Sequence, residues 1–233
     1  MSKKKQKEKK TQKQFENIEE SLSKSEEFIV NNQKVLTIIM AVLILVVLGY
    51  FGYKKYYLQP KEKMAQELIY PAQHYFRVDS LSKALYGDGN NLGFIDIAKD
   101  YSMTKAGNLA NYYAGICYLK KGEFDKAIQY LKKFESDDEI VGPMAKGAIG
   151  DAYLAKGDKS QAVTFYMEAA NLQNNEFTTP MFLLKAGEVD EMMRNYDAAI
   201  QAYKRIQQDF YKSLEAKNIE KYIARAEALK KGE

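Results

Sequence analysis

The chain has 233 residues, of which 46% are hydrophobic and 28% are charged, so a membrane segment would leave enough chain for one domain of ordinary size. The formal net charge is +4, but residues 1–55 hold 11 Lys and 6 Glu, and the rest holds 24 basic and 25 acidic residues. The basic excess therefore lies in the N-terminal tail. A basic tract can bind nucleic acid, but beside a membrane segment it is more commonly a solvated topology signal, so we expect no nucleic-acid partner.

The residues that usually carry chemistry are scarce. Cys117 is the single cysteine and His74 the single histidine, so neither an intrachain disulfide nor a usual zinc site can form. The sequence has no P-loop and no GxGxxG motif. We therefore expect no metal, no cofactor and no enzymatic activity.

An apolar segment near the N-terminus has the length of a membrane span. Between Lys34 and Lys54 lie 19 uncharged residues, which as a helix would span about 28 Å against a hydrocarbon core of about 30 Å. An aromatic and lysine-containing belt follows: Tyr50, Phe51, Tyr53, Lys54, Lys55, Tyr56 and Tyr57. Large aromatics instead of a small-residue cleavage site argue against a cleaved signal peptide. The sequence predicts an uncleaved single-span anchor at residues 34–55.

The orientation of this anchor is open from charge alone. The lysine-rich tail favours a cytoplasmic N-terminus. The residues nearest the membrane favour the opposite orientation, because residues 19–33 hold one Lys and four Glu whereas residues 54–63 hold four Lys. Within the tail, residues 1–33, apolar side chains recur at helical spacing and predict a short amphipathic helix. They are Phe15, Ile18, Leu22 and Ile29, with Ser25 in the same stripe.

A repeat follows the anchor. Gly115, Gly150 and Gly187 are spaced by 35 and 37 residues, and twelve residues after each glycine comes an alanine. These alanines are Ala127, Ala162 and Ala199, and the intervening turns hold Gly122, Gly157 and Asn195. This pattern is that of the tetratricopeptide repeat (TPR), a helix–turn–helix unit of about 34 residues. Small residues at these positions let antiparallel helices approach closely.

The repeats define the predicted fold class, which is all-α, with a single N-terminal transmembrane helix followed by a TPR-like α-solenoid. Tyr118 and Tyr153, three residues after the first two glycines, are expected to fill the wedge between repeats, and Asp190 replaces them in the third. We place the domain at residues 56–233 and the repeats at 108–141, 143–176 and 180–213. A degenerate first repeat, with a helix at 72–86, a turn at 87–90 and a helix around 92–101, precedes them. A capping helix at 214–229 follows.

The first helix of each TPR lines the concave face of a solenoid. The positions that point inward are largely apolar and rich in methionine: Leu109, Tyr112, Ile116, Leu119, Met144, Leu154, Met181 and Leu184, with Met192 beside them. Such a groove suits loosely specific binding of apolar peptide. Alternatively, the helix at 72–86 or the C-terminal helix fills the groove. Tyr112 and Ile116 stand where co-chaperones of the carboxylate-clamp kind carry Lys and Asn, so that function is disfavoured.

The order of these features resembles a family. The acidic lead-in at residues 25–28 (Ser-Glu-Glu-Phe), residues 31–34 (Asn-Asn-Gln-Lys), one anchor and a compact TPR domain are similar to the YfgM-type ancillary subunits of the bacterial SecYEG translocon. Residues 209–211 (Asp-Phe-Tyr) and 221–225 (Lys-Tyr-Ile-Ala-Arg) resemble the last helix of that family. The resemblance covers nearly the whole chain, although its TPR part is generic and the lysine-rich tail is longer than is usual in the family.

The resemblance implies a bacterial inner-membrane protein with a cytoplasmic N-terminus and a periplasmic TPR domain. Its partners would be the SecYEG translocon, a membrane-anchored PpiD-type periplasmic chaperone and emerging or unfolded polypeptides. Two other functions remain open from the residues themselves. One is a structural scaffold of another cell-envelope complex for secretion, motility or division, and the other is an adaptor facing the cytoplasm.

Overall fold

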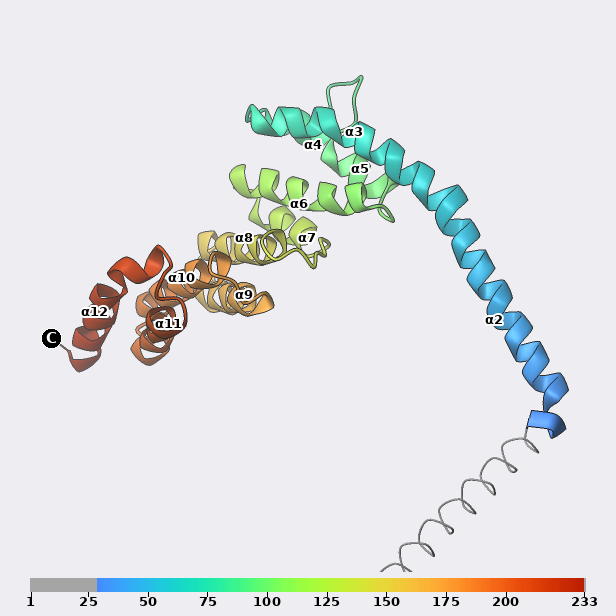
Figure 1. Cartoon of the computed structure of the whole chain (residues 1–233). Helices are drawn as coiled ribbons and strands as arrows, with labels where there is room; N and C mark the ends of the chain where they lie inside the picture. Colours follow the sequence, from blue (N-terminus) through green and yellow to red (C-terminus); the bar gives the residue numbers. More distant parts are fainter. Residues whose placement is uncertain (1–28, 233) are drawn as a thin grey trace, which may run out of the picture. The chain divides into compact units, whose positions relative to one another are not determined.

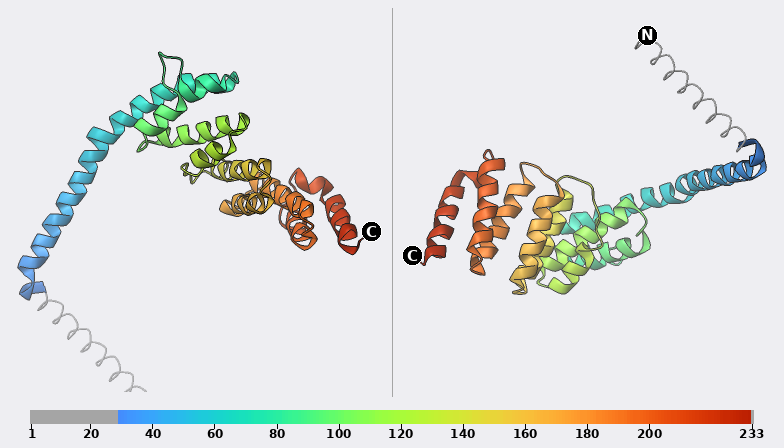
Figure 2. Two further views of the ribbon diagram at one scale, coloured as in Figure 1. Left: turned by 180° about the vertical axis from the view of Figure 1, so that it is seen from behind. Right: turned by 90° about the horizontal axis from the view of Figure 1, so that it is seen from below.

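The computed structural model describes residues 29–232, which form helices and turns and contain no strand (Figure 1). The chain divides into two compact units, with the boundary between Gln59 and Pro60, four residues after the predicted end of the anchor. The amphipathic helix predicted in the tail lies outside the described residues, apart from Ile29. Figure 2 gives two further views of the helices.

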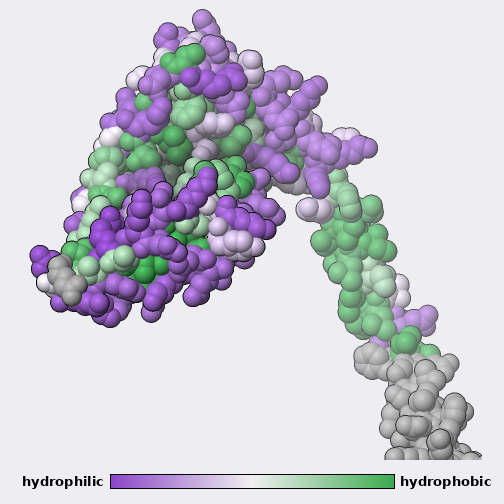
Figure 3. All heavy atoms as spheres, turned by 60° about the vertical axis from the view of Figure 1, so that its left-hand side comes forward, coloured by the Kyte–Doolittle hydropathy of each residue, from purple (hydrophilic) through white to green (hydrophobic). Residues whose placement is uncertain are grey.

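The first unit contains the helix α2 (Gln33–Tyr53) and the π-helical turn η1 (Lys54–Leu58). None of the residues in α2 is buried, most of its large hydrophobic side chains are exposed, and the face of the helix seen in Figure 3 is hydrophobic. A helix that is hydrophobic all round belongs in a protein core or in a membrane, and α2 has no protein core around it. The chain is helical from Gln33 to Arg77, and this helix is long and apolar enough to span a membrane.

The aromatic belt spans the end of α2 and the π-helical turn η1. The rings of Tyr53 and Tyr57 stack with their centroids 5.2 Å apart, and the Lys55 ammonium lies 5.8 Å from the centroid of Tyr56. A π-helical turn widens the helix locally, and the sequence pattern did not predict it.

The second unit is a row of helices that pack one on the next. They are α3 (Gln59–Arg77), α4 (Leu81–Tyr86), α5 (Phe94–Asp100), α6 (Lys105–Lys120), α7 (Phe124–Leu131), α8 (Val141–Ala155), α9 (Lys159–Leu172), α10 (Thr178–Met192), α11 (Tyr196–Asp209), the 3-10 turn η2 (Glu215–Asn218) and α12 (Ile219–Lys231). Helices α6 to α11 form three hairpins, and α5 and α12 pack against the two ends of this set. The all-α solenoid expected from the repeats is confirmed.

Each first helix begins two or three residues before the start of its predicted repeat, because a polar side chain ahead of it binds the free amide groups of its first turn. The Thr104 hydroxyl accepts a hydrogen bond from Gly107 N at the start of α6. Asp138 accepts from Ile140 N and Val141 N at the start of α8. Asn175 Oδ1 accepts hydrogen bonds from Phe177 N and Thr178 N at the start of α10.

The helix predicted over residues 72–86 is wrong, because the chain breaks there into α3 and α4. Asp79 takes a left-handed φ of 57° in the connecting turn, and Ser80 N donates a hydrogen bond to Tyr75 O over 2.8 Å. The apolar pattern continues across this turn, so periodicity alone could not show the break. The predicted C-terminal helix is likewise divided, since η2 occupies its first turn and α12 begins at Ile219.

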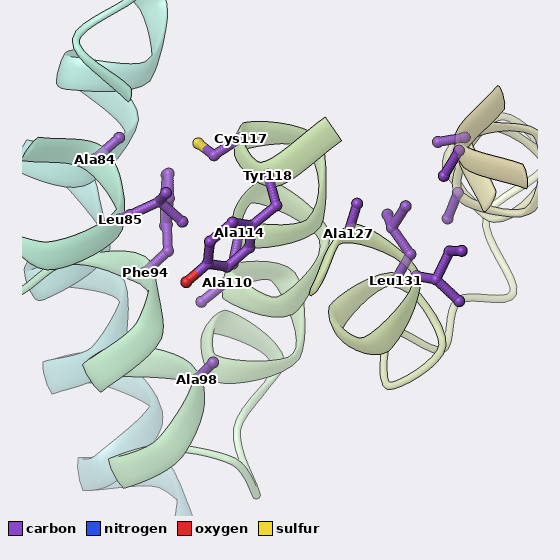
Figure 4. Close-up of a cluster of buried hydrophobic side chains, with 14 of the residues drawn as sticks. Ala84, Leu85, Phe94, Ala98, Ala110, Ala114, Cys117, Tyr118, Ala127 and Leu131 are labelled. Atoms are coloured by element: carbon purple, nitrogen blue, oxygen red, sulfur yellow. The ribbon is translucent and has the colours of Figure 1, made fainter. Parts of the chain in front are cut away.

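The core of the repeat domain consists of two clusters of buried side chains, one over α3 to α9 and the other over α9 to α12. Figure 4 shows part of the first cluster, in which Ala84, Ala110 and Ala114 lie near Leu85 and Phe94, and Ala127 lies toward Leu131. The alanines allow the helix backbones to approach closely. Cys117 lies in this cluster, and burial raises the pKa of its thiol to about 12, so it is packed as an inert apolar group.

Candidate protein-binding surface

Each repeat glycine accepts one large side chain from the second helix of its own hairpin. A Cβ atom added at Gly150 would lie 2.6 Å from Tyr166 Cε1, and one added at Gly187 would lie 2.4 Å from Tyr203 Cε1. At Gly115 the neighbour is Leu131, whose Cγ would be 2.5 Å away. Leu131, Tyr166 and Tyr203 all follow their glycine by sixteen residues. This constant spacing makes the partner position visible in the sequence, although no role was predicted for Leu131.

The other predicted packing residues lie in or beside the core. Ala127, Ala162 and Ala199 are fully buried. Tyr118 is buried and stacks on Tyr130, with the ring centroids 5.5 Å apart.

Tyr153 is half-buried, stacks on Phe165 at 5.3 Å and packs against both core clusters. Asp190, which replaces these tyrosines in the third repeat, is 4% exposed and accepts a hydrogen bond from Asn195 Nδ2. Its burial raises the pKa of the Asp190 carboxyl. The third repeat therefore has a polar side chain at a position that is aromatic in the other two.

Tyr166 and Tyr203 each donate a hydrogen bond to a carboxylate on the first helix of their own hairpin. Tyr166 Oη donates to Asp151 Oδ1 over 2.6 Å, and Lys185 Nζ of the next repeat donates to the same oxygen over 2.7 Å. Burial raises the pKa of the Tyr166 phenol, and the Asp151 carboxylate raises it further.

The third repeat carries a matching arrangement. Tyr203 Oη donates to Glu191 Oε1 over 2.7 Å, and Arg225 of α12 binds both Glu191 oxygens at 2.9 Å. Burial again raises the pKa of the Tyr203 phenol, followed by the hydrogen bond to Glu191. We call these two arrangements the Asp151 clasp and the Glu191 clasp, and each ties one repeat to the helix that follows it.

These contacts bring successive first helices side by side. Gly147 of α8 meets the Phe182 ring of α10, which an added Cβ would approach to 1.9 Å. The Asp151 clasp joins α8 to α10, and the Glu191 clasp joins α10 to α12. Helices α6, α8, α10 and α12 therefore present neighbouring surfaces, and Figure 3 shows hydrophobic residues gathered in a hollow of the domain between hydrophilic margins.

The residues predicted for the groove are less exposed than an open groove requires. Leu109, Tyr112, Ile116 and Leu119 are half-buried and pack against the first cluster. Met144, Leu154, Met181 and Leu184 are half-buried against the second. Met192 is 57% exposed. Their outer edges alone are available to a partner.

The same face also carries acidic side chains in its second and third repeats. Asp151, Glu188 and Glu191 occupy inward positions there, alongside the apolar side chains. Asp151 and Glu191 are held in the clasps, whereas Glu188 forms no hydrogen bond or ion pair among the described residues. Burial raises the pKa of the Glu188 carboxyl, and Arg225 and Lys185 oppose that rise. The face is thus apolar over α6 and combines apolar and acidic side chains over α8 and α10.

Two hollows border the connection between α7 and α8. A cavity of about 810 Å³ lies between that connection and the start of α6, and Leu109 is the predicted groove residue that lines it. A second cavity of about 590 Å³ lies between the same connection, α8 and α9.

Within residues 29–232, no group of three or more His, Cys, Asp and Glu side chains is placed to hold a metal ion. His74 lies exposed on α3, beside Tyr75.

Comparison with known families addresses the repeats directly. Models of the tetratricopeptide repeat match residues 109–137, 145–176 and 182–213, and each matched range falls within one of the predicted repeats. The helical domain contains tetratricopeptide repeats. No curated protein matches the chain. Proteins with these repeats typically serve as non-enzymatic scaffolds for protein–protein interaction, so the domain is suited to binding protein partners.

Proposed function

We propose that this chain is a membrane-anchored protein-binding module whose repeat domain holds polypeptide segments on the face of α6, α8 and α10. The observation that carries the proposal is the row of first helices in matched repeats, with apolar edges over α6 and the Glu188 carboxylate further along. Half-buried apolar edges bind extended chain weakly and with little sequence preference, as a binder of varied clients requires. The module catalyses no reaction in this account.

The proposed anchor is residues 34–55. Helix α2 exposes hydrophobic side chains on every side, which in water would form an apolar patch far larger than soluble domains tolerate. Tyr50, Phe51 and Tyr53 precede Lys54 and Lys55, the residue types that favour the boundary between hydrocarbon and water. A single span with a cytoplasmic N-terminus and a periplasmic repeat domain follows from the resemblance to the YfgM-type subunits.

The finer proposal is an accessory subunit of the Sec translocon that handles translocated polypeptides together with a PpiD-type chaperone. The order of anchor and repeats supports it, as does an apolar face at the start of the repeat domain. The alternative is a structural scaffold of another cell-envelope complex. The Asp151 and Glu191 clasps are an argument for this alternative. They rigidify the acidic half of the face, as suits one fixed partner.

Binding of a permanently unfolded polypeptide tests the module itself. Reduced and carboxymethylated α-lactalbumin is titrated against the full-length protein in detergent micelles. We expect Leu109→Gln, Leu154→Gln and Leu184→Gln together to weaken binding at least fivefold. A matched triple variant at exposed positions elsewhere, Val78→Gln, Leu214→Gln and Leu229→Gln, should bind as the wild type does. Equal binding by both folded triple variants would remove this face from the account.

Affinity purification from membranes tests the finer proposal. The tagged protein, extracted in a mild detergent, should retain translocon subunits above the level of a single-span control protein. Stoichiometric recovery of another envelope complex without translocon subunits would favour the scaffold. Alkaline phosphatase fused to the C-terminus should be active, because that enzyme requires the periplasm, and an inactive fusion would favour the adaptor that faces the cytoplasm.

A further inference from the structure

Helix α7 is about two turns shorter than its counterparts in the other repeats. It ends at Leu131, the residue that packs on Gly115. The corresponding residues in the other hairpins are Tyr166 and Tyr203, and α9 and α11 each continue for six residues beyond them.

The connection after α7 is held away from a helical path by polar contacts. Asn108 of α6 donates to Glu135 O over 2.6 Å and accepts from Glu135 N over 3.1 Å. Asp138 is engaged at the start of α8. Phe134 occupies the sequence position of Ala169 and Ile206, which are fully buried in the other repeats, but its ring is half-buried and packs beside Tyr112 of α6.

The missing turns leave part of α8 and α9 uncovered. The cavity of about 590 Å³ opens there and is lined by Ala145, Ile149, Phe165 and Leu172. Leu172, the last residue of α9, is 43% exposed at this cavity. In the next repeat the end of α9 covers the equivalent surface of α10 with the fully buried Ala169 and Ala170. The fold itself therefore shows what fits such a surface, namely two turns of helix with small side chains.

The charge at the rim narrows the choice of occupant. Lys132 Nζ lies 5.3 Å from the centroid of Phe165 and 3.4 Å from Tyr153 Oη, and it forms no ion pair among residues 29–232. Lys146, by contrast, is paired with Glu168 at 2.8 Å. Glu135 and Asp137 line the side formed by the connection, so an incoming carboxylate is favoured beside Lys132 and disfavoured opposite it.

We propose that this cavity, the α7 gap, is a docking site for a short amphipathic helix of a partner protein. The helix supplies the two turns that α7 lacks. Its small apolar side chains lie on Ala145 and Ile149, and an acidic side chain pairs with Lys132. None of the nine predicted groove residues lines the α7 gap, so this site is separate from the face of α6, α8 and α10. The repeat domain thereby has two protein-binding surfaces, one for extended chain and one for a helix.

The probe for this site is a lactam-bridged helical peptide with the sequence of α9, residues 159–172, carrying a fluorophore. Its anisotropy is followed on titration with the full-length protein in detergent micelles. We expect saturable binding that Leu172→Glu weakens at least tenfold, because the new charge would be desolvated against the peptide. Leu214→Glu, a control at a leucine that is 70% exposed and lies far along the sequence, should change the affinity less than twofold.

A charge exchange makes the test independent of folding defects. Lys132→Glu should weaken binding of the peptide that carries its native Glu168. A peptide with Glu168→Lys should bind the Lys132→Glu protein with at least half of the lost affinity restored. No binding to the wild type, or equal binding to the Leu172→Glu and Leu214→Glu proteins, would overturn the proposal. So would light scattering that shows a dimer lost in Leu172→Glu, because the occupant would then be a second copy of this chain.

Discussion

The first and third repeats have the same pattern of small residues where their helices cross, which we call the repeat frame, but they pack different large side chains against it. In both, a glycine and an alanine let the two helices of a hairpin cross closely. The first repeat places Leu131 against its glycine and ends α7 there, whereas the third places Tyr203 against its glycine and continues α11 for two more turns. The third repeat also carries the Glu191 clasp, for which the first has no equivalent among the described residues.

This difference shows that one set of residues determines the geometry of the hairpin and another determines how much of the neighbouring surface is covered. The small residues determine how closely the helices approach and are common to all three repeats. The large side chain and the length of the second helix determine whether the neighbouring surface is closed, as around α11, or open, as beside α7. The first repeat therefore leaves more of the neighbouring helices uncovered, and the third is tied more firmly to the helix that follows it.

The largest effect is expected from removing the tyrosine of the third repeat. Tyr203→Ala should lower the free energy of unfolding by about 4 kcal/mol, because it leaves a cavity beside Gly187 and removes the hydrogen bond to Glu191. Leu131→Ala should cost about 3 kcal/mol in the first repeat, since it removes a smaller apolar group and no hydrogen bond. Urea unfolding followed by circular dichroism measures both. Equal losses would contradict the idea that the third repeat is held more firmly.

The Glu191 clasp can be broken without a cavity. Glu191→Gln should cost about 2 kcal/mol, because it weakens the paired hydrogen bonds with Arg225 and the bond from Tyr203. Asp151→Asn should cost about 1 kcal/mol, since the Asp151 side chain is 39% exposed and the Glu191 side chain only 10%. Thermal unfolding at low and high salt measures which variant loses more stability. A larger loss for Asp151→Asn would show that the burial of the carboxylate does not determine how much each clasp contributes to stability.

The turns of the hairpins offer a comparison at the backbone. Gly122 and Gly157 take left-handed φ values of 76° and 86°, and Arg194 takes 61° at the same place in the third repeat, one residue before the predicted Asn195. Arg194→Gly should therefore stabilise the protein by about 1 kcal/mol, because a side chain is strained in this conformation. Gly157→Ala should destabilise it by a similar amount, and a destabilised Arg194→Gly protein would show that the arginine side chain makes an offsetting contact.

The smallest effect concerns Glu188 and depends on pH. Burial holds its pKa above the ordinary value of 4.5, so the folded state binds the proton more tightly than the unfolded state. The unfavourable effect of the charge is then fully present at neutral pH and disappears as the pH falls through the raised pKa toward 4.5. Glu188→Gln should raise Tm at pH 7.5 and leave it unchanged near pH 4. A Tm difference that is independent of pH would assign the effect to packing.

The repeat frame could be predicted from sequence because glycine and alanine recur at fixed spacing, and only small residues fit where the helices cross. Tyr153 and Ala162 lie where that spacing placed them. The break at Asp79 could not be predicted, because the apolar pattern runs through it and an aspartate adopts the left-handed conformation without any signal in periodicity.

The surface was harder to predict than the frame. The apolar character of residues at inward positions was visible in the sequence, but their partial burial depends on contacts between repeats, such as that of Phe182 with Gly147. The clasps also join residues from separate hairpins, so spacing within one repeat does not reveal them. The early end of α7 depends on Asn108, which lies in the preceding helix.

Site-specific photocrosslinking tests the central claim most directly. A benzoylphenylalanine placed at Leu109 on α6, or at Leu229 on α12 as a control, is activated in intact membranes during protein export. We predict polypeptide adducts from Leu109 that an excess of unfolded α-lactalbumin suppresses, and few from Leu229. Adducts of equal yield from both positions, or none from Leu109 in a folded protein, would contradict the claim that the face of α6, α8 and α10 holds polypeptide segments.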